Sequence, residues 1–181
     1  MIETTRLIIR PFVMDDLDTI HRILNESFGN SELQERRSWL QWSILNQEWF
    51  DKMHQPPYGD CAIVLKSSRQ LIGSVGLVPL LSPFGQIPEL GVASRGHYTP
   101  EVGLFWVIDQ PYRGQHYATE AAQAMIDFAF KQLRIARILA MTEYSNAASQ
   151  SVMRNLGMRL LLNPLSDPAW LQIVGVLNND A

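Results

Sequence analysis

The stretch Glu101-Val-Gly-Leu-Phe-Trp-Val-Ile-Asp-Gln-Pro-Tyr-Arg-Gly-Gln-His-Tyr-Ala-Thr-Glu-Ala121 decides how the rest of the chain is interpreted. Its first part, Val102 to Ile108, is apolar and rich in β-branched and aromatic residues, which predicts a buried strand. Residues 109–111 end that strand. Apolar residues at helical spacing follow from Ala122 to Phe130. The stretch therefore predicts a strand, a glycine-containing turn and the start of a helix.

The turn between this strand and this helix is a candidate anion-binding site. The start of a helix leaves about four backbone N–H groups without partners inside the helix. These groups and the positive end of the helix dipole suit a phosphate or a pyrophosphate. An ordinary connection between a strand and a helix has the same spacing, so spacing alone leaves both interpretations open.

A family resemblance favours the anion site. The segment Arg113-Gly-Gln-His-Tyr-Ala118 resembles the Gln/Arg-x-x-Gly-x-Gly/Ala signature of the GNAT N-acetyltransferases, which bind the pyrophosphate of acetyl-CoA. The longer match, Glu101-Val-Gly-Leu-Phe-Trp106 followed by Tyr-Arg-Gly and Ala-Thr-Glu-Ala, is similar to the branch that acetylates the N-termini of ribosomal proteins. The resemblance implies that the cofactor-binding residues here are Arg113, Gly114, Gln115, His116, Tyr117, Ala118 and Thr119.

His116 departs from the family pattern, because it stands where the family usually has its middle glycine. If the backbone there adopts a positive φ, a side chain could crowd the phosphate. If the residue is already helical, only its N–H matters and histidine is tolerated.

The segment Asn146-Ala-Ala-Ser-Gln-Ser-Val-Met-Arg-Asn-Leu-Gly-Met158 is the second match. In the family, an asparagine just after the fifth strand contacts the pantetheine arm of the cofactor and opens a helix that ends at Gly-Phe or Gly-Met. From the residues alone, Asn146 is a good N-cap and Ser149 lies one turn in, on the same face, so capping alone also explains them. The resemblance further implies that backbone groups of Trp106, Val107 and Ile108 bind the pantetheine amides. They would do so where this strand, the fourth of the chain, splays apart from the fifth.

Acetylation of an amine requires a base to remove a proton. Glu101, at the start of the strand that ends at Ile108, is the first choice for this base. The alternative is that Glu101 is a plain surface carboxylate, and Glu89 and Glu143 are rival candidates for the base. Many family members place a tyrosine seven residues after the asparagine as general acid, but this chain has Met153 there, which cannot donate a proton. Ser149 or water is then left to protonate the leaving thiolate.

Other reactive residue types form no pattern that indicates a site. His21, His54 and His97 are expected to be structural or solvated, and Cys61 a small buried hydrophobic residue. No His, Cys, Asp or Glu cluster has metal-ligand spacing, so no metal is expected. The nucleophile elbow of serine hydrolases and the Gly-x-Gly-x-x-Gly fingerprint of Rossmann enzymes are both missing.

Size and charge set further limits. The chain has 181 residues and a net charge of −3, which predicts one domain over residues 1–181 and no nucleic-acid or membrane partner. The single cysteine excludes an internal disulfide and permits a reducing cytoplasm, where we expect the protein to act. The first residues lack the apolar region of a signal peptide, and no apolar run is long enough to span a bilayer.

The pattern along the whole chain predicts alternating strands and helices. Strands are expected at Thr5–Arg10, Cys61–Lys66, Leu71–Leu80, Val102–Ile108, Ala136–Thr142, Met158–Leu162 and Trp170–Leu177. Helices are expected over 17–28, from a capping box at Ser31–Gln34 to Met53, from the central turn to about Leu133, and over 146–156. Residues 81–99, rich in Gly and Pro, are expected to form a long loop.

This order defines the fold class. It predicts an α/β (α+β) single domain with a central mixed, mostly antiparallel sheet of about seven strands and helices on both faces. It matches the GNAT order throughout, with residues 101–160 as the acetyl-CoA-binding core and residues 28–58 as a variable helical region on the acceptor side. Four aromatic residues in that region either fill the core or line the acceptor pocket: Trp39, Trp42, Trp49 and Phe50.

The resemblance implies an acetyl-CoA-dependent N-acetyltransferase that transfers the acetyl group directly to a primary amine, without a covalent enzyme intermediate. The acceptor is expected to be a protein N-terminus or a small molecule, such as an amino acid or an amine-bearing antibiotic. The alternative is a non-catalytic acyl-CoA-binding or interaction module with the same fold, which Met153 and His116 favour. A monomer and a homodimer are both compatible with the sequence.

Overall fold

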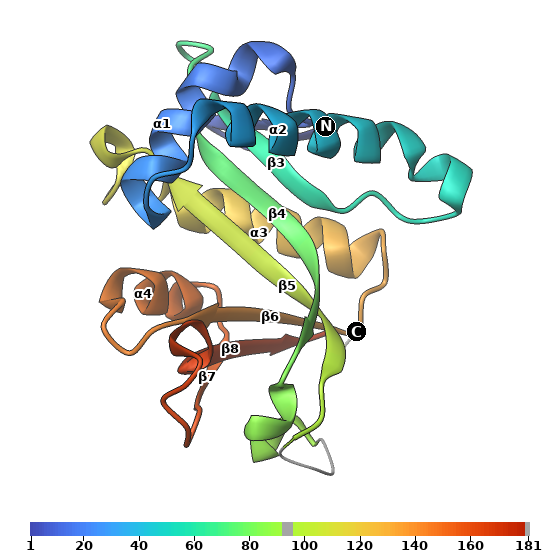
Figure 1. The fold of residues 1–181 in the computed structure, drawn as a ribbon, viewed down its shortest axis with the longest axis vertical. Helices are drawn as coiled ribbons and strands as arrows, with labels where there is room; N and C mark the ends of the chain where they lie inside the picture. The colour runs from blue at the N-terminus through green and yellow to red at the C-terminus, as the bar shows by residue number, and fades with distance from the viewer. Residues whose placement is uncertain (92–95, 180–181) are drawn as a thin grey trace. The chain divides into compact units, whose positions relative to one another are not determined.

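A computed structural model describes residues 1–91 and 96–179 (Figure 1). The chain forms two compact units. The first unit comprises residues 1–77 and 105–125, and the second comprises residues 78–104 and 126–181. The strands are β1 Ile2–Glu3, β2 Leu7–Arg10, β3 Gly59–Leu65, β4 Leu71–Ser82, β5 Thr99–Ile108, β6 Arg137–Thr142, β7 Arg159–Leu162 and β8 Ile173–Asn178. The helices are α1 Leu17–Phe28, α2 Leu33–Trp49, α3 Tyr117–Lys131 and α4 Ala147–Asn155.

The strands are hydrogen-bonded in the order β1-β2-β3-β4-β5-β6-β8-β7, and β4 and β5 run from one unit into the other. All seven expected strands are present, which confirms the predicted fold class. The eighth strand, β1, pairs antiparallel with β2 through Ile2 and Ile9. Two residues are too few to give a periodic signal, so the sequence pattern missed this strand.

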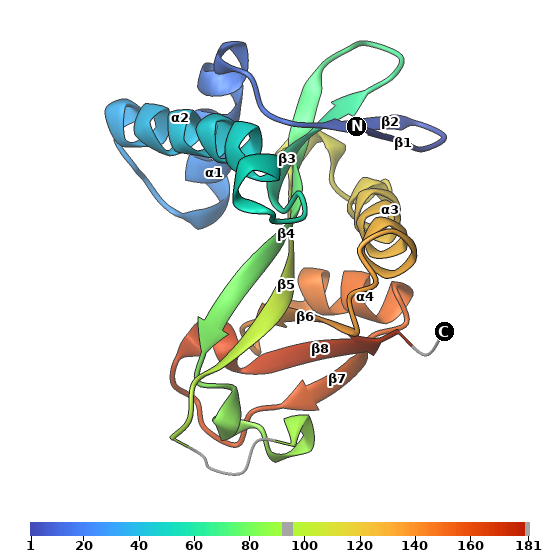
Figure 2. The same ribbon diagram turned by 90° about the vertical axis from the view of Figure 1, so that its right-hand side faces the viewer.

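In the first unit, α1 and α2 lie on one face of the strands and the beginning of α3 lies on the other (Figure 2). The α1 side has a core that includes Ile8, Ile20, Leu40, Val64 and Val107. These residues come from α1, α2, β2, β3 and β5, so one apolar cluster holds the two helices against the strands.

Gly73 and Gly76 mark places where backbones approach closely. A side chain at Gly73 would collide with the carbonyl of Val107 in β5, and one at Gly76 with the carbonyl of Gly59 in β3. The pairing of β3 with β4 also shifts register between residues 63 and 64. Glycine is therefore required here by space, whatever it costs in strand propensity.

The start of α2 differs from the predicted capping box. The helix begins at Leu33 and its N-cap is Glu32, whose N–H donates to Glu35 Oε2 at 3.2 Å. The N–H of Ser31 donates instead to Asn25 Oδ1 in α1. The predicted box at Ser31–Gln34 was wrong by one residue, because a contact with α1 takes Ser31.

The aromatic residues of α2 divide into two groups. Phe50 is buried, and Trp39 packs edge-on against Phe12 with ring centroids 5.6 Å apart. Trp42 is 60% exposed and Trp49 is 47% exposed, so of the two alternatives left by the sequence, filling the core does not apply to them. Apolar residues are spread around α2, and its sequence therefore does not mark one buried face.

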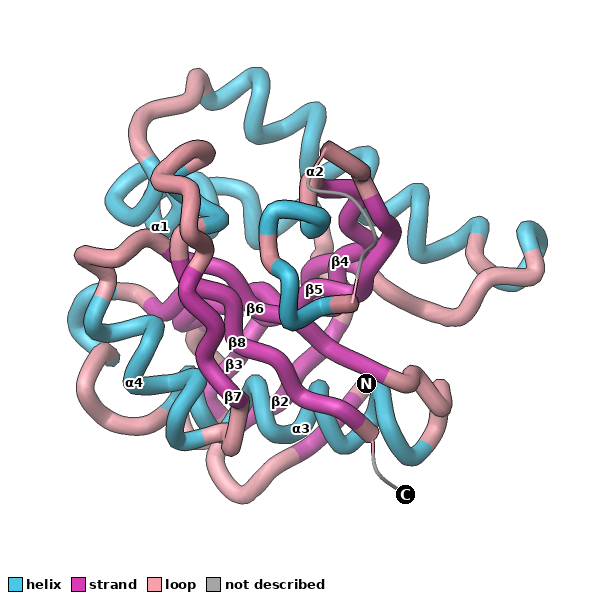
Figure 3. The backbone as a smooth tube through the Cα atoms, turned by 90° about the horizontal axis from the view of Figure 1, so that it is seen from below, coloured by secondary structure: helices cyan, strands magenta, loops and turns pink. Residues whose placement is uncertain are grey.

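In the second unit, β8 pairs antiparallel with both β6 and β7 (Figure 3). Its core includes Phe84, Ile87, Leu139, Leu161 and Val174. Strand β5 runs parallel to β6, and among the described residues the two pair through Gly103 and Leu139. Such brief pairing agrees with the predicted splay of these two strands.

The boundaries of two predicted segments need correction. The region 81–99 begins as the end of β4, holds 3₁₀ turns at Phe84–Gln86 and Pro88–Leu90, and ends in β5; residues 92–95 lie outside the described part. Trp170 belongs to a 3₁₀ turn, Ala169–Leu171, and the last strand begins at Ile173. In the described part of the chain, no helix is long and apolar enough to cross a membrane.

Candidate functional site

The turn that precedes α3 has an unusual backbone. After β5 ends, residues Gln110–Tyr112 form a 3₁₀ turn. Gly114 then adopts φ +75° and His116 adopts φ +64°, both in the left-handed region. The carbonyl of His116 accepts the N–H of Glu120 at 3.0 Å, so α3 grows directly from this residue. Of the two possibilities for His116, the positive φ is the one observed, and it explains why a glycine fits the position.

The turn carries a run of unpaired backbone donors. In the described part of the chain, the main-chain N–H groups of residues 114–119 donate to no acceptor. Residues 113–116 are exposed, and residues 117–119 are half-buried. Since these donors precede and open a helix, they form the kind of site that binds an anionic phosphate.

The side chain of Arg6, in the first unit, holds this turn in place. Its Nη2 donates to the carbonyl of Gln115 at 3.1 Å, and its guanidinium lies over the ring of Tyr117, 4.2 Å from the centroid. Its Nε donates to Glu120 Oε2 at 2.6 Å. One side chain therefore contacts the turn and the first helical turn of α3 at three points.

Glu120 completes this fastening. Its Oε1 accepts the hydroxyl of Thr4 at 2.6 Å and the main-chain N–H of Arg6 at 2.9 Å. Burial alone would raise the pKa of Glu120, but these bonds and the guanidinium of Arg6 outweigh it and lower the pKa. Thr4, Arg6 and Glu120 together form a turn clamp.

Two further side chains stabilise the end of β5. Arg113 points back and donates to the carbonyl of Ile108 at 2.8 Å and to Ser27 Oγ at 3.0 Å. Asp109 is buried and pairs with both terminal nitrogens of Arg22 at 2.8 and 2.7 Å. The hydrogen bond from Arg22 lowers the pKa of Asp109 against the opposing effect of burial. The side chain of Arg113 thus connects the turn to the carbonyl of Ile108 and to Ser27.

The remaining predicted cofactor-binding residues fall into both units. Trp106, Val107 and Ile108 form the end of β5 in the first unit, and the last two are buried. Asn146 and Ser149 open α4 in the second unit. Asn146 Oδ1 accepts the N–H of Ser149 at 3.0 Å, so the predicted capping role of Asn146 is confirmed.

Met153, at the position of the family's catalytic tyrosine, is fully buried. Its sulfur lies close to Gly175 of β8, where an added Cβ would meet it at 3.1 Å. This side chain packs α4 onto the strands of the second unit and has no access to solvent.

Glu101 is held by Arg137 within the second unit. The Nε of Arg137 donates to Glu101 Oε2 at 3.1 Å, and Nη2 pairs with Oε1. The Glu101 side chain is only 9% exposed, so it is not the surface carboxylate that the sequence left open as an alternative. Its rivals Glu89 and Glu143 are both exposed. A guanidinium that binds both oxygens orients the carboxylate firmly.

Asp60 is a carboxylate that the sequence reasoning missed. It lies on β3 of the first unit, and its Oδ1 is buried without a hydrogen-bond partner. Burial raises its pKa to about 6. Burial first, and then the neighbouring Asp60, also raise the pKa of the Cys61 thiol to about 11. A lone Asp in an apolar strand gives little warning of burial, because the pattern does not say which face is covered.

The turn clamp was also missed as a unit, because its residues lie in two distant segments of the chain. Thr4 and Arg6 belong to the opening segment, and Glu120 belongs to the central stretch. Nothing local links them, since Thr4 and Glu120 are 116 positions apart. Among residues 1–91 and 96–179, no group of three or more His, Cys, Asp or Glu side chains could hold a metal ion.

Comparison with known proteins agrees with this geometry. A family model described as "Acetyltransferase (GNAT) domain" matches residues 6–159. The N-acetyltransferase YnaD of Bacillus subtilis, named as uncharacterized, is 27% identical over 162 residues, which are 87% of this chain and 82% of YnaD.

Solved structures share the fold. An acetyltransferase from Agrobacterium tumefaciens has a TM-score of 0.72 at 24% identity, covering 97% of this chain and 92% of that one. RimL, a ribosomal L7/L12 α-N-protein acetyltransferase in complex with coenzyme A, has a TM-score of 0.66 at 14% identity, covering 98% and 97%. Because the family model covers most of the chain, the protein belongs to the GNAT acetyltransferases and is an N-acetyltransferase.

Proposed function

We propose that the protein transfers an acetyl group from acetyl-CoA directly to a primary amine. The observation that carries this proposal is the turn at residues 113–119, where unpaired N–H groups and two left-handed residues stand at the family's pyrophosphate signature. Acetyl-CoA supplies the reactive thioester. The residues of the turn fit its pyrophosphate because they offer donors and no acidic side chain.

Further residues are proposed to hold the rest of the cosubstrate. The backbone of Trp106, Val107 and Ile108 binds the pantetheine amides, and so does Asn146. The Asn146 oxygen is used by the cap, but its amide NH₂ group has no partner among the described residues, so it can donate. Orientation of the thioester by such bonds converts a bimolecular reaction into an effectively intramolecular one.

Glu101 is proposed as the base that removes a proton from the acceptor amine, directly or through water. It is held rigidly by Arg137, as expected for a group that must meet the amine in one position. Ser149 is proposed to protonate the leaving thiolate, since its hydroxyl has no hydrogen-bond partner among the described residues. Water is the alternative donor, because Met153 has no proton to give.

The test of the base is the substitution Glu101→Gln, which keeps the size and a hydrogen bond to Arg137. We expect kcat to fall about 10²- to 10⁴-fold while the Kd for CoA stays nearly constant. The rate of the variant should rise with pH, since solution then supplies more neutral amine. Glu89→Gln and Glu143→Gln are matched controls, and full activity of Glu101→Gln near neutral pH would remove Glu101 from this role.

A non-catalytic acyl-CoA-binding module is the second candidate. It is favoured by Met153, which is buried where a catalytic tyrosine is usual. Two measurements separate the candidates: thiol release from acetyl-CoA with pooled amines, and CoA binding by titration calorimetry. Tight binding without turnover over a broad amine panel would support the module.

The remaining expectations stay predictions. These are a single domain over residues 1–181, a cytoplasmic location, the absence of nucleic-acid, membrane and metal partners, and a monomeric or homodimeric state. The choice between a protein N-terminus and a small-molecule amine as acceptor is also open, and the second unit offers a feature that bears on it.

A further inference from the structure

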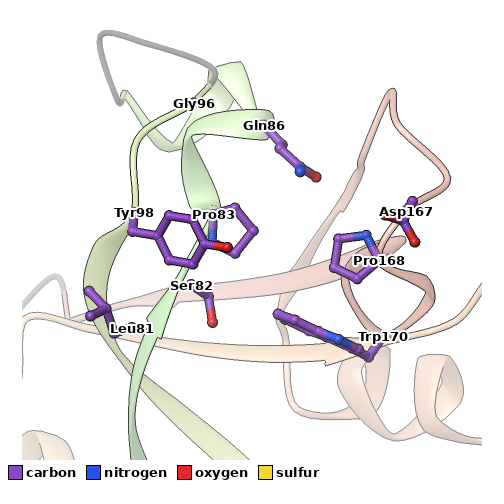
Figure 4. A pocket seen from close by; sticks show the side chains of 9 residues that line it. All are labelled: Leu81, Ser82, Pro83, Gln86, Gly96, Tyr98, Asp167, Pro168 and Trp170. Atoms are coloured by element: carbon purple, nitrogen blue, oxygen red, sulfur yellow. The ribbon is translucent and has the colours of Figure 1, made fainter.

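The second unit contains a cavity of ≈ 420 Å³ (Figure 4). Three segments surround it: the end of β4 with the turn after it, the residues just before β5, and the connection between β7 and β8. Its lining residues are Leu81, Ser82, Pro83, Gln86, Gly96, Tyr98, Asp167, Pro168 and Trp170. The volume is within the range of ligand pockets, roughly 300–1,000 Å³.

Two aromatic side chains at this cavity are exposed to solvent. Tyr98 is 63% exposed and Trp170 is 46% exposed. In Figure 4 they lie at opposite sides of the hollow, with Tyr98 beside Pro83 and Trp170 below Pro168. Exposed aromatic rings at a hollow offer apolar surface to a ligand, and their faces attract cations.

The charge of the cavity lining also favours a cation. Among its described lining residues, Asp167 is the one charged side chain, and it is exposed. An organic cation would therefore find a carboxylate and two aromatic rings, whereas an anion would find no positive group.

Hydrogen bonds hold the Gln86 side of the cavity in place. Gln86 Oε1 accepts the amide of the fully buried Asn163 at 2.8 Å. Asn163 is itself held, because its carbonyl accepts the hydroxyl of Tyr144 at 2.8 Å and its Oδ1 accepts the N–H of Leu165 at 3.0 Å. The segments on both sides of the cavity are thus joined by polar bonds before any ligand arrives, which lowers the cost of binding.

We propose that this cavity binds an alkylammonium group of the acceptor, one that is not itself acetylated. This rests on the proposed function. The nitrogen that reacts must be neutral, whereas Asp167, Tyr98 and Trp170 favour a charged group. The acceptor class is therefore an amine with a second positive charge: an α,ω-diamine, or a peptide whose basic side chain follows its N-terminus closely.

The proposed base lies close to this cavity along the chain. Tyr98 precedes Glu101 by three residues, and the chain from Thr99 onward is extended. At about 3.3 Å per residue, the cavity wall and the proposed base are about 10 Å apart along the strand.

The first test measures binding alone, in the absence of CoA, with tetramethylammonium chloride as the probe, because this cation cannot be acetylated. The indole N–H signal of Trp170 in an ¹⁵N–¹H spectrum should shift and saturate. Trp170→Leu and Asp167→Asn should each weaken binding about threefold to thirtyfold, measured by calorimetry. Trp170→Phe should retain most of the affinity, and Asp18→Asn, an exposed carboxylate on α1, should retain all of it.

The second test measures turnover with 1,5-diaminopentane, pentylamine, and peptides that carry Lys or Ala at the second position. Asp167→Asn should raise the KM of the doubly charged acceptors about tenfold and leave that of pentylamine unchanged. Preference for the diamine or for the Lys peptide identifies the source of the ammonium group. Tetramethylammonium that does not bind, or that binds equally to Trp170→Leu and Asp167→Asn, overturns the proposal. Absence of turnover with every amine, with the binding test positive, would instead overturn the proposed function.

Discussion

Two helix starts in this protein resemble the same family's cofactor-binding segments, and they are built in opposite ways. At α4, in the second unit, the side chain of Asn146 caps the helix and accepts the N–H of Ser149. At α3, in the first unit, the N–H groups of residues 114–119 have no acceptor in the described chain. One start satisfies its own donors, and the other leaves them available.

A helix start without a cap needs another source of order. At α3 the turn clamp supplies it, since Thr4 and Arg6, in the chain just before β2, bind Glu120 of α3, and Arg6 also binds the carbonyl of Gln115 in the turn. A helix start that leaves its donors open, as the proposed anion site does, therefore depends on distant side chains to hold its backbone in place.

The largest effect is expected at Gly114. Gly114→Val places a β-branched residue at φ +75° and should weaken CoA binding by roughly 1–3 kcal/mol, about 5- to 150-fold. Gly157→Val is the matched control, because Gly157 has φ +76° and equally open space but follows α4. Both variants should lose stability in thermal melts, and only the first should lose CoA affinity in calorimetry. Equal CoA affinity in a folded Gly114→Val protein would contradict the anion site.

The next effect tests the turn clamp. Arg6→Gln removes the guanidinium from Gln115, Tyr117 and Glu120, and should raise the Kd for CoA about fivefold, about 1 kcal/mol for a half-exposed pair. The KM for acetyl-CoA should rise while kcat stays constant, and Arg6→Lys should restore part of the loss. Lys131→Gln, which breaks an exposed ion pair at the other end of α3, is the control.

The clamp also predicts a pH dependence. The pKa of Glu120 is lowered in the folded protein, so its contribution to stability is complete above its unfolded value of 4.5 and is lost as the pH falls through the lower, folded value. Melting temperatures of the parent should therefore drop more steeply in acid than those of Glu120→Gln. Parallel curves for the two proteins would show that the clamp does not depend on this charge.

The capped helix gives a smaller and separable effect. Asn146→Ala should destabilise the protein by about 0.5–2 kcal/mol, because α4 loses its cap. Asn146→Asp keeps the cap oxygen but loses the amide NH₂, so it should retain stability while CoA affinity falls. If CoA affinity is unchanged in Asn146→Asp, the residue only caps its helix.

The smallest effect is expected at His116. His116→Gly relieves the left-handed conformation at φ +64° and should raise stability by about 0.5–1 kcal/mol, with CoA bound at least as tightly. Arg134→Gly, at φ +55°, should give the same gain in stability without any change in CoA affinity. A loss of turnover in His116→Gly with binding intact would reveal a catalytic histidine.

Local patterns in the sequence determined much of this protein. The apolar run at Val102–Ile108 and the turn after it predicted a strand and a helix start, and both are present. Asn146 was predicted as a cap and is one. These features depend on neighbours within a few positions, where propensity and spacing act directly. The order of elements and the family follow from the same signals.

Only the tertiary structure decided which distant side chains meet. Arg6 and Glu120 are 114 positions apart, Glu101 and Arg137 are 36 apart, and Gln86 and Asn163 are 77 apart. Their meetings depend on strand order and register, which no local period encodes. The left-handed φ of His116 and the exposure of Trp42 depend likewise on what packs around them. The sequence by itself therefore determined which segment passes from a strand through a turn into a helix, and the packing of distant strands decided how that segment is held.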